Sequence, residues 1–251
     1  MYSQALRDIP QELRNSPEPK SINGKGKTEI DSMSPEVKER LGRIAAQMVR
    51  DGMVVGLGTG STAAEFIKAL GNRIEEEGIS ISGVPTSLQA QLLAEQNSIK
   101  IVSSDTIDLA VDGADQVDSK NYISKGGGGA LLKEKLIDYR ADMLVILADR
   151  TKFVTHLTRV YVEVHPQAIH QVSRQLEKHG APTLRTVGGK GIQNGDQVFI
   201  TESGNVIFDL KTKVKEPVVL EKMLNQIPGV MENGIFTKEC IVLGRPVGAP
   251  G

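Results

Sequence analysis

The sequence predicts an α/β fold, with an open, mostly parallel, Rossmann-like sheet and a second, smaller α+β domain of ferredoxin-like type. Short apolar runs alternate with amphipathic helical segments between residues 34 and 159, which is the pattern of a parallel sheet covered by helices. Beyond residue 160 a helix, a hairpin and another helix follow in close order, which is typical of antiparallel α+β structure. We therefore expect a Rossmann-like domain over residues 34–159 and 236–251, and a small α+β domain over residues 160–235.

The first 33 residues differ in composition from the rest of the chain. Residues 1–33 are rich in Ser, Pro, Asn, Gly and Lys, so we expect a disordered extension. The folded part should begin with a helix that Ser34 caps and in which Pro35 takes the first position. Apolar residues recur from Val37 to Met48 at helical spacing.

The next elements alternate between strands and helices up to about residue 148. The apolar runs predict buried strands, and the segments between them carry helical periodicity. The expected strands are 53–57, 79–81, 99–102, 107–111 and 143–148, and the expected helices follow residues 60, 87 and 130. In the helix over 130–139 we expect the stripe of Leu132, Leu136 and Tyr139 to face the core.

The C-terminal part predicts the smaller domain. A strand over 160–164 and a helix over 168–179 precede a hairpin whose arms are 198–201 and 206–210. A helix over 218–226 follows. We expect the apolar residues between 239 and 243 to return to the large sheet as its last strand.

Composition and charge exclude several classes of protein. Thirty basic residues nearly balance thirty-one acidic ones, for a net charge of −1, which gives no reason to expect nucleic acid or an anionic membrane as a partner. The single cysteine, Cys240, cannot form an intrachain disulfide, and its apolar neighbours indicate a buried structural thiol. No run approaches the roughly 20 apolar residues of a membrane span, and the first residues lack a signal-peptide core. We expect a cytoplasmic protein.

The turn Gly58-Thr59-Gly60-Ser61-Thr62 lies between a predicted strand and a helix. Glycines allow a ligand to approach the backbone closely, and the free N–H groups of a helix N-terminus attract anions. A phosphate is one interpretation, and a plain strand–helix turn is another. A dinucleotide fingerprint fits less well, because its third glycine would fall at Ser61.

Two aspartates, Asp112 and Asp115, flank Gly113 and Ala114 directly after an apolar strand. Carboxylates at the end of a buried strand are costly unless they are paired or used. They could hold sugar hydroxyls, act as acid and base, bind magnesium or cap a turn.

Four consecutive glycines follow Lys125 and lead into a helix that carries Glu134. Such a loop makes sense if it wraps around a ligand, with Lys125 as a nearby positive charge. Glu134 lies opposite the predicted apolar stripe, so the pattern alone favours a solvated surface residue. Lys152, in the loop after the strand 143–148, could reach the same sheet edge or lie in solvent.

The four histidines of the chain do not cluster and have no companion cysteines, so we expect no zinc site. No other ligand cluster is obvious, and we expect no metal.

These segments, taken in order, resemble the A-type ribose-5-phosphate isomerase family over nearly all of residues 36–245. The motifs that carry the resemblance are Gly58-Thr59-Gly60-Ser61-Thr62, Asp112-Gly113-Ala114-Asp115, Lys125-Gly126-Gly127-Gly128 with Glu134, and Ala148-Asp149 with Lys152. Lesser landmarks are Val84-Pro85-Thr86-Ser87, Glu163-Val164-His165-Pro166 and Ile227-Pro228-Gly229-Val230.

The resemblance implies an isomerase that interconverts D-ribose 5-phosphate and D-ribulose 5-phosphate through an enediolate, in the non-oxidative pentose phosphate pathway. It implies no metal or organic cofactor, and a homodimer or homotetramer. Glu134 would be the general base, with Asp112, Asp115 and Lys125 as further catalytic residues. The implied substrate site is Lys38, Thr59, Gly60, Ser61, Thr62, Asp112, Gly113, Ala114, Asp115, Lys125, Gly126, Gly127, Gly128 and Lys152. On this hypothesis Lys125, packed against both aspartates, keeps their carboxylates ionised.

Other functions stay open at this point. Amino-sugar-phosphate deaminases, lactonases and coenzyme A transferases have related folds. A non-catalytic sugar-phosphate sensor and a nicotinamide-dependent oxidoreductase are further alternatives.

Overall fold

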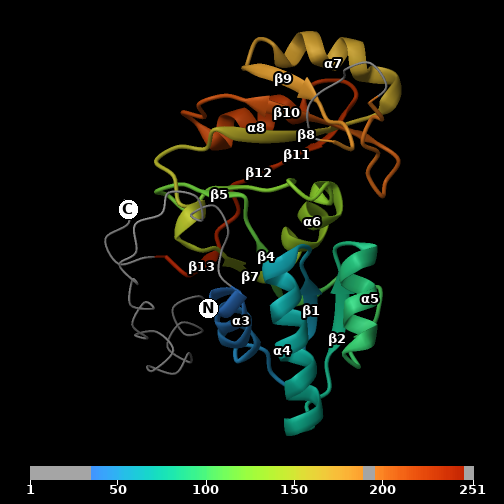
Figure 1. Ribbon diagram of the computed structural model, residues 1–251, viewed down its shortest axis with the longest axis vertical. Coiled ribbons are helices and arrows are strands. Elements are labelled where there is room, and N and C mark those ends of the chain that lie inside the picture. Colours follow the sequence, from blue (N-terminus) through green and yellow to red (C-terminus); the bar gives the residue numbers. More distant parts are fainter. Residues whose placement is uncertain (1–34, 189–195, 246–251) are drawn as a thin grey trace.

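A computed structural model describes residues 35–188 and 196–245 of the chain. Figure 1 shows a large sheet flanked by helices in the lower part of the molecule and a smaller sheet with two helices in the upper part. The predicted extension over residues 1–33 and the capping residue Ser34 lie outside the described residues.

The large sheet has six strands, and every neighbouring pair in it is parallel. Its strand order is β13-β7-β4-β1-β2-β3. The strands are β1 (Val54–Leu57), β2 (Ser82–Pro85), β3 (Lys100–Ile101), β4 (Ile107–Gly113), β7 (Ala141–Leu147) and β13 (Ile241–Leu243). This confirms the predicted parallel sheet and the return of the C-terminal strand to it. The second strand begins at Ser82, one residue after the apolar pair that indicated it.

The helices cover both faces of the large sheet. One face packs against α3 (Pro35–Ala46), α4 (Ser61–Glu77) and α5 (Leu88–Gln96), and the other packs against α6 (Leu131–Asp138). Alternate residues of β7 enter the two cores, as in any strand buried on both faces: Val145 and Leu147 face one core, and Leu144 and Ile146 face the other.

The smaller sheet is antiparallel, with the strand order β11-β8-β10-β9. Its strands are β8 (Arg159–Val164), β9 (Ala181–Leu184), β10 (Val206–Lys211) and β11 (Val230–Asn233), and its helices are α7 (Ile169–Leu176) and α8 (Pro217–Asn225). The predicted α/β class with a smaller α+β part is therefore confirmed. The predicted first hairpin arm forms only isolated bridges at Val198 and Ile200, and β9 was not predicted.

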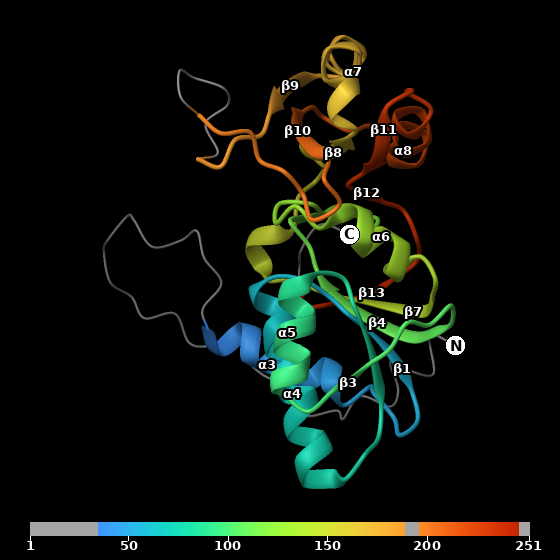
Figure 2. The same cartoon turned by 90° about the vertical axis from the view of Figure 1, so that its right-hand side faces the viewer.

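Three strands of two residues each form a connecting sheet that sequence patterns did not reveal. They are β5 (Gln116–Val117), β6 (Ile123–Ser124) and β12 (Ile235–Phe236). Figure 2 shows β12 and α6 between the large and small sheets. The proposed domain boundaries fall at the start of β8 and inside β12.

The expected orientation of α6 is wrong. Leu136 is 57% exposed and Tyr139 is 37% exposed, whereas Glu134, Lys135 and Asp138 are buried. The charged face of the helix therefore points inward. Oppositely charged side chains lie there: Lys125 beside Glu134, and Glu221 and Glu232 beside Lys135. No helix within the described ranges 35–188 and 196–245 combines the length and apolar character needed to cross a bilayer.

Candidate active site

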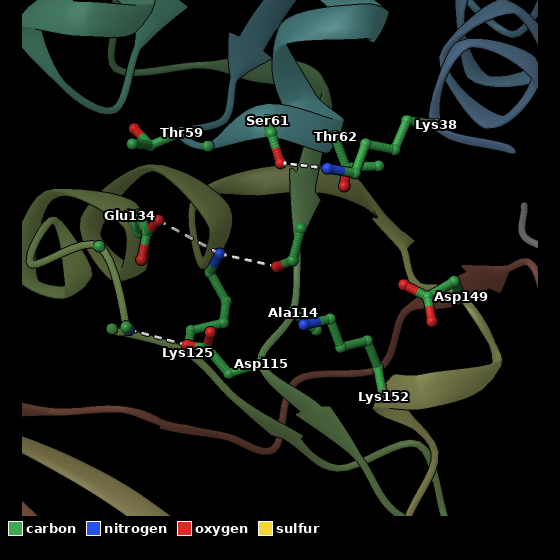
Figure 3. A pocket seen from close by; sticks show the side chains of 15 residues that line it. Lys38, Thr59, Ser61, Thr62, Ala114, Asp115, Lys125, Glu134, Asp149 and Lys152 are labelled. Atoms are coloured by element: carbon green, nitrogen blue, oxygen red, sulfur yellow. Dashed lines mark hydrogen bonds and ion pairs between the residues drawn. The ribbon is translucent and has the colours of Figure 1, made fainter. Parts of the chain in front are cut away.

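A cavity of about 310 Å³ lies where β1, β4 and β7 end, at the edge where open α/β sheets bind ligands. Fourteen of the fifteen predicted site residues line it. The exception is Asp112, which is fully buried and lies behind Lys125. The one addition is Asp149, from the turn after β7. Figure 3 shows Glu134 and Lys125 on one side of the cavity and Lys38, Ser61, Thr62, Asp149 and Lys152 on the other.

The turn after β1 forms one end of the cavity. Gly60 has a φ of 103° immediately before α4, a conformation that favours glycine. The helix then begins at Ser61, so its free N–H groups face the cavity. The Nζ atom of Lys38 donates a hydrogen bond of 2.9 Å to Ser61 Oγ. A helix N-terminus, a hydroxyl and an ammonium group together have the chemistry to bind an anion.

Lys152 adds a second cation to this end. It belongs to the 3₁₀ turn η1 (Arg150–Lys152), which Asp149 caps by accepting a hydrogen bond from Thr151 N through Oδ1. The other oxygen of Asp149, Oδ2, is buried and accepts no hydrogen bond from any described residue. Asp149 belongs to a motif that carries the family resemblance, but it was not among the predicted site residues.

Thr59, which lines the cavity, connects the ends of neighbouring strands. Its hydroxyl lies 2.7 Å from Thr86 Oγ1 and 2.7 Å from Ser87 Oγ, and its backbone N–H donates to Asp112 Oδ1 at 3.2 Å. The Asp112 carboxylate thereby connects the ends of β1 and β4.

The opposite end holds a buried cluster of two acids and one lysine. The Nζ atom of Lys125 lies 2.9 Å from Asp112 Oδ2 and 3.4 Å from Glu134 Oε1, and it donates to the carbonyl oxygen of Gly113 at 2.8 Å. The other Glu134 oxygen, Oε2, is buried and accepts no hydrogen bond from a described residue. One carboxylate oxygen thus stays available for a ligand.

Burial controls the protonation of this cluster. It raises the pKa of Glu134 to about 8, because desolvation and the nearby Asp112 outweigh the opposing Lys125 ammonium. Burial likewise raises the pKa of Asp112 despite Lys125. Burial alone would lower the pKa of Lys125, but Asp112 and Glu134 outweigh it and the pKa is raised. That Lys125 keeps both aspartates ionised stays a prediction: its ammonium group lowers the pKa of Asp112 but only partly offsets the burial of that carboxylate.

Asp115 has a different partner from the one expected. Its Oδ2 atom accepts a 2.7 Å hydrogen bond from Gly127 N, so it holds the glycine loop rather than Lys125. A Cβ atom on Gly127 would lie 2.5 Å from Asp115 Oδ1, which explains the need for glycine there. The loop is also held by Arg185, whose Nη1 atom donates to the Gly126 carbonyl oxygen at 2.9 Å. Arg185 comes from the small sheet region and carries no motif that sequence analysis could have used.

The part of the chain that the structure describes contains no group of three or more His, Cys, Asp or Glu side chains suited to hold a metal ion. Cys240 is half-buried, and desolvation raises the pKa of its thiol to about 12.

Comparison with known proteins identifies the family. A family model described as ribose 5-phosphate isomerase A (phosphoriboisomerase A) matches residues 82–247. The protein named ribose-5-phosphate isomerase A from Methanocaldococcus jannaschii is 44% identical over 209 residues, which are 81% of this chain and 91% of that protein. The similarity extends to many further relatives of the same name, including one from Methanococcus vannielii at 43% identity over 85% of this chain and 91% of its own.

Solved structures of the same family resemble this chain in fold. The structure of the Methanocaldococcus jannaschii enzyme superposes with a TM-score of 0.77 at 43% identity, covering 82% of this chain and 93% of that one. A structure of a D-ribose-5-phosphate isomerase in complex with phospho-erythronic acid has a TM-score of 0.77 at 43% identity and covers 84% of this chain and 95% of its own. On these similarities in sequence and structure, the chain belongs to the ribose 5-phosphate isomerase A family.

Proposed function

We propose that this protein interconverts D-ribose 5-phosphate and D-ribulose 5-phosphate through an enediolate. The observation that carries the proposal is the placement of a buried Glu134–Lys125 pair across one cavity from an anion site. A sugar phosphate has the matching chemistry, with a reactive carbonyl at one end and a phosphate at the other. Membership of the family and the relative solved with phospho-erythronic acid support the same substrate.

Glu134 acts as the base. In ribose 5-phosphate it removes the proton from C2, so that a C1–C2 double bond forms and negative charge develops on O1. It then returns the proton to C1, while a proton moves from O2 to O1, which gives the ketose. A carboxylate with a pKa of about 8 is a stronger base than an ordinary glutamate and matches the weak acidity of the C2 proton better.

Lys125 stabilises the developing enediolate. Its ammonium group is buried and already fixed by Asp112 and the Gly113 carbonyl oxygen, so little reorganisation is needed when charge appears. The backbone N–H groups of the loop after Lys125 can add further donors. Because Asp112 does not line the cavity, we assign it the role of holding Lys125, and we assign contact with the sugar hydroxyls to Asp115.

The phosphate binds at the N-terminus of α4, with Lys38, Ser61, Thr62 and Lys152 as partners. It takes no part in the proton transfer. Its binding energy orients the distant reacting carbons beside Glu134.

A direct assay tests this function. Purified protein is incubated with ribose 5-phosphate without added metal or nucleotide, and formation of ribulose 5-phosphate is followed by NMR. Glucosamine 6-phosphate, a 6-phosphogluconolactone and acyl-coenzyme A serve as substrates of the rival activities. Turnover of ribose 5-phosphate supports the proposal, and turnover of one of the others alone refutes it.

The reaction belongs to the non-oxidative pentose phosphate pathway. A homodimer or homotetramer stays a prediction, which light scattering on the purified protein tests. Exposed apolar side chains on α8 and β11, such as Val219, Met223 and Met231, are compatible with it. A cytoplasmic location is likewise a prediction, which cell fractionation tests.

A further inference from the structure

Lys135 is a buried charged residue that does not line the cavity. It follows Glu134 directly on α6. Its ammonium group has three partners: Glu221 Oε1 at 2.8 Å, Glu232 Oε1 at 3.0 Å and the Asn233 carbonyl oxygen at 2.9 Å. It donates hydrogen bonds to Glu232 and to the Asn233 carbonyl oxygen and forms an ion pair with Glu221, so the buried charge is well compensated.

These partners are themselves fixed. Glu221 also accepts a 2.7 Å hydrogen bond from Tyr139 OH, which lies one turn beyond Lys135 on α6. Glu232 accepts a 2.7 Å hydrogen bond from Asn225 Nδ2. We call the residues Lys135, Tyr139, Glu221, Glu232 and Asn233 the Lys135 network. The network ties α6 to α8 and β11 of the small sheet, and Figure 2 shows α6 close to both.

The segment that follows Asn233, residues 234–236, also contacts Lys125. Directly after Asn233, the Gly234 carbonyl oxygen accepts a hydrogen bond of 2.9 Å from Lys125 N. The next two residues form β12, which pairs with β6 immediately before Lys125. The ring of Phe236 lies 5.7 Å from Lys125 Nζ and 5.0 Å from Lys135 Nζ. A single segment, residues 232–236, therefore contacts both the helix of Glu134 and the strand of Lys125.

Helix α6 needs such support. It has only eight residues, and no side chain caps its N-terminus at Ala130. Helices of this length are not stable by themselves. Among the residues that the structure describes, the Glu134 carboxylate has one polar side-chain partner, Lys125 at 3.4 Å, so its position depends on how α6 is held.

We propose that Lys135 is a positioning residue for the isomerisation: through its network it fixes the Glu134 carboxylate against Lys125 and the reacting carbons. This inference rests on the proposed function. It assigns to Lys135 an effect on turnover and not on substrate binding, because within the described part of the chain no hydrogen bond or ion pair joins the network to the anion site at the other end of the cavity.

The variant Lys135→Met removes the charge and keeps most of the length of the side chain. Lys133→Met is the matched control, since Lys133 is an exposed lysine on the same helix. We expect Lys135→Met to lower kcat about 10–100-fold, since a displacement of about 1 Å can cost that much, with KM within about twofold of wild type. Inhibition by 4-phospho-D-erythronic acid, whose carboxylate stands in for the enediolate oxygens, should weaken by a similar factor. Lys133→Met should match wild type in all three measurements.

Circular dichroism at the assay temperature shows whether each variant is folded. A folded Lys135→Met with kcat within twofold of Lys133→Met overturns the proposal. A variant in which kcat falls and KM rises by a similar factor also overturns it. If Lys135→Met does not fold, Glu221→Gln decides: a lowered kcat at unchanged KM supports the proposal, and wild-type kcat overturns it. A wild-type protein without isomerase activity would instead refute the proposed function, before any variant is compared.

Discussion

Lowering the pH from about 9 to about 6 should reduce kcat/KM of the wild-type protein about 100-fold. The cause is protonation of Glu134, which must be ionised to take the C2 proton. Burial raises its pKa to about 8, so about one molecule in 100 carries the ionised base two pH units lower. An ordinary glutamate, with a pKa near 4.5, would stay ionised over the whole range.

The assay is the initial rate of ketose formation from ribose 5-phosphate at each pH, taken at low substrate so that it reports the free enzyme. The substrate phosphate also titrates near pH 6. Asp112→Asn provides the comparison, because it removes a charge that raises the pKa of Glu134 without lining the cavity. In Asp112→Asn the fall of kcat/KM on the acid side should move to lower pH. The phosphate titrates in the same way with both proteins, so it does not cause this shift. A wild-type rate that is flat down to about pH 6 would refute the reasoning.

The same raised pKa affects stability. The unfolded chain releases the Glu134 proton near pH 4.5, whereas the folded protein keeps it up to about pH 8. The stability that the folded protein gains by binding this proton more tightly than the unfolded chain is fully present below about pH 4.5. It is lost as the pH rises through about 8. Between about pH 6 and pH 9 the wild type should lose about 3 kcal/mol of unfolding free energy that Glu134→Gln retains. Urea unfolding of both proteins at about pH 6 and pH 9 measures this difference, and an equal difference at both values would contradict it.

Three further substitutions test the separate parts of the site. Lys125→Met leaves Asp112 buried without its cation, so it should lower kcat at least about 100-fold and destabilise the fold by about 3–5 kcal/mol; an unchanged urea midpoint would contradict this. Lys38→Met removes a cation from the anion site and should raise KM about tenfold with a smaller effect on kcat, and steady-state kinetics showing an unchanged KM would count against the phosphate assignment. Gly58→Ala places a Cβ atom 2.6 Å from Asp112 Cα and should cost about 1–3 kcal/mol or more in unfolding free energy, whereas Gly113→Ala, which meets no atom within 4 Å, should be tolerated in the same urea experiment.

Much of the site could be predicted because the fold is parallel. The carboxyl ends of parallel strands meet at one sheet edge, so polar turns after β1, β4 and β7 had to converge even though they are far apart in the sequence. The glycine run after Lys125 and the start of α5 at Ser87 could be recognised from the local sequence alone. Ser87 accepts a hydrogen bond from Ala90 N at 3.1 Å, as an N-cap serine does.

The orientation of α6 could not be predicted. Periodicity assumes that apolar side chains face inward, and on that basis Glu134 belonged on the surface. The partners that reverse the helix, Glu221 and Glu232, lie more than 80 residues later in the chain. No local pattern shows that a lysine will meet two carboxylates in the interior.

The short strands could not be predicted from the sequence for a different reason. A strand of two residues, such as β6 or β12, is too short to show alternation. Strand β9 contains Pro182, a residue that sheets accept mainly at their edges, and β9 is an edge strand. Position in the finished sheet, and not local propensity, decided these segments.

The most direct test compares wild type and Glu134→Gln in heavy water with ribose 5-phosphate, followed by proton NMR. The wild type should form ribulose 5-phosphate that carries solvent deuterium at C1, and the variant should turn over about 10²–10⁴-fold more slowly at a similar KM. Near-normal turnover by the variant would contradict a glutamate that carries the proton between the two carbons, whereas product without deuterium would show only that the carried proton does not exchange with solvent on the way.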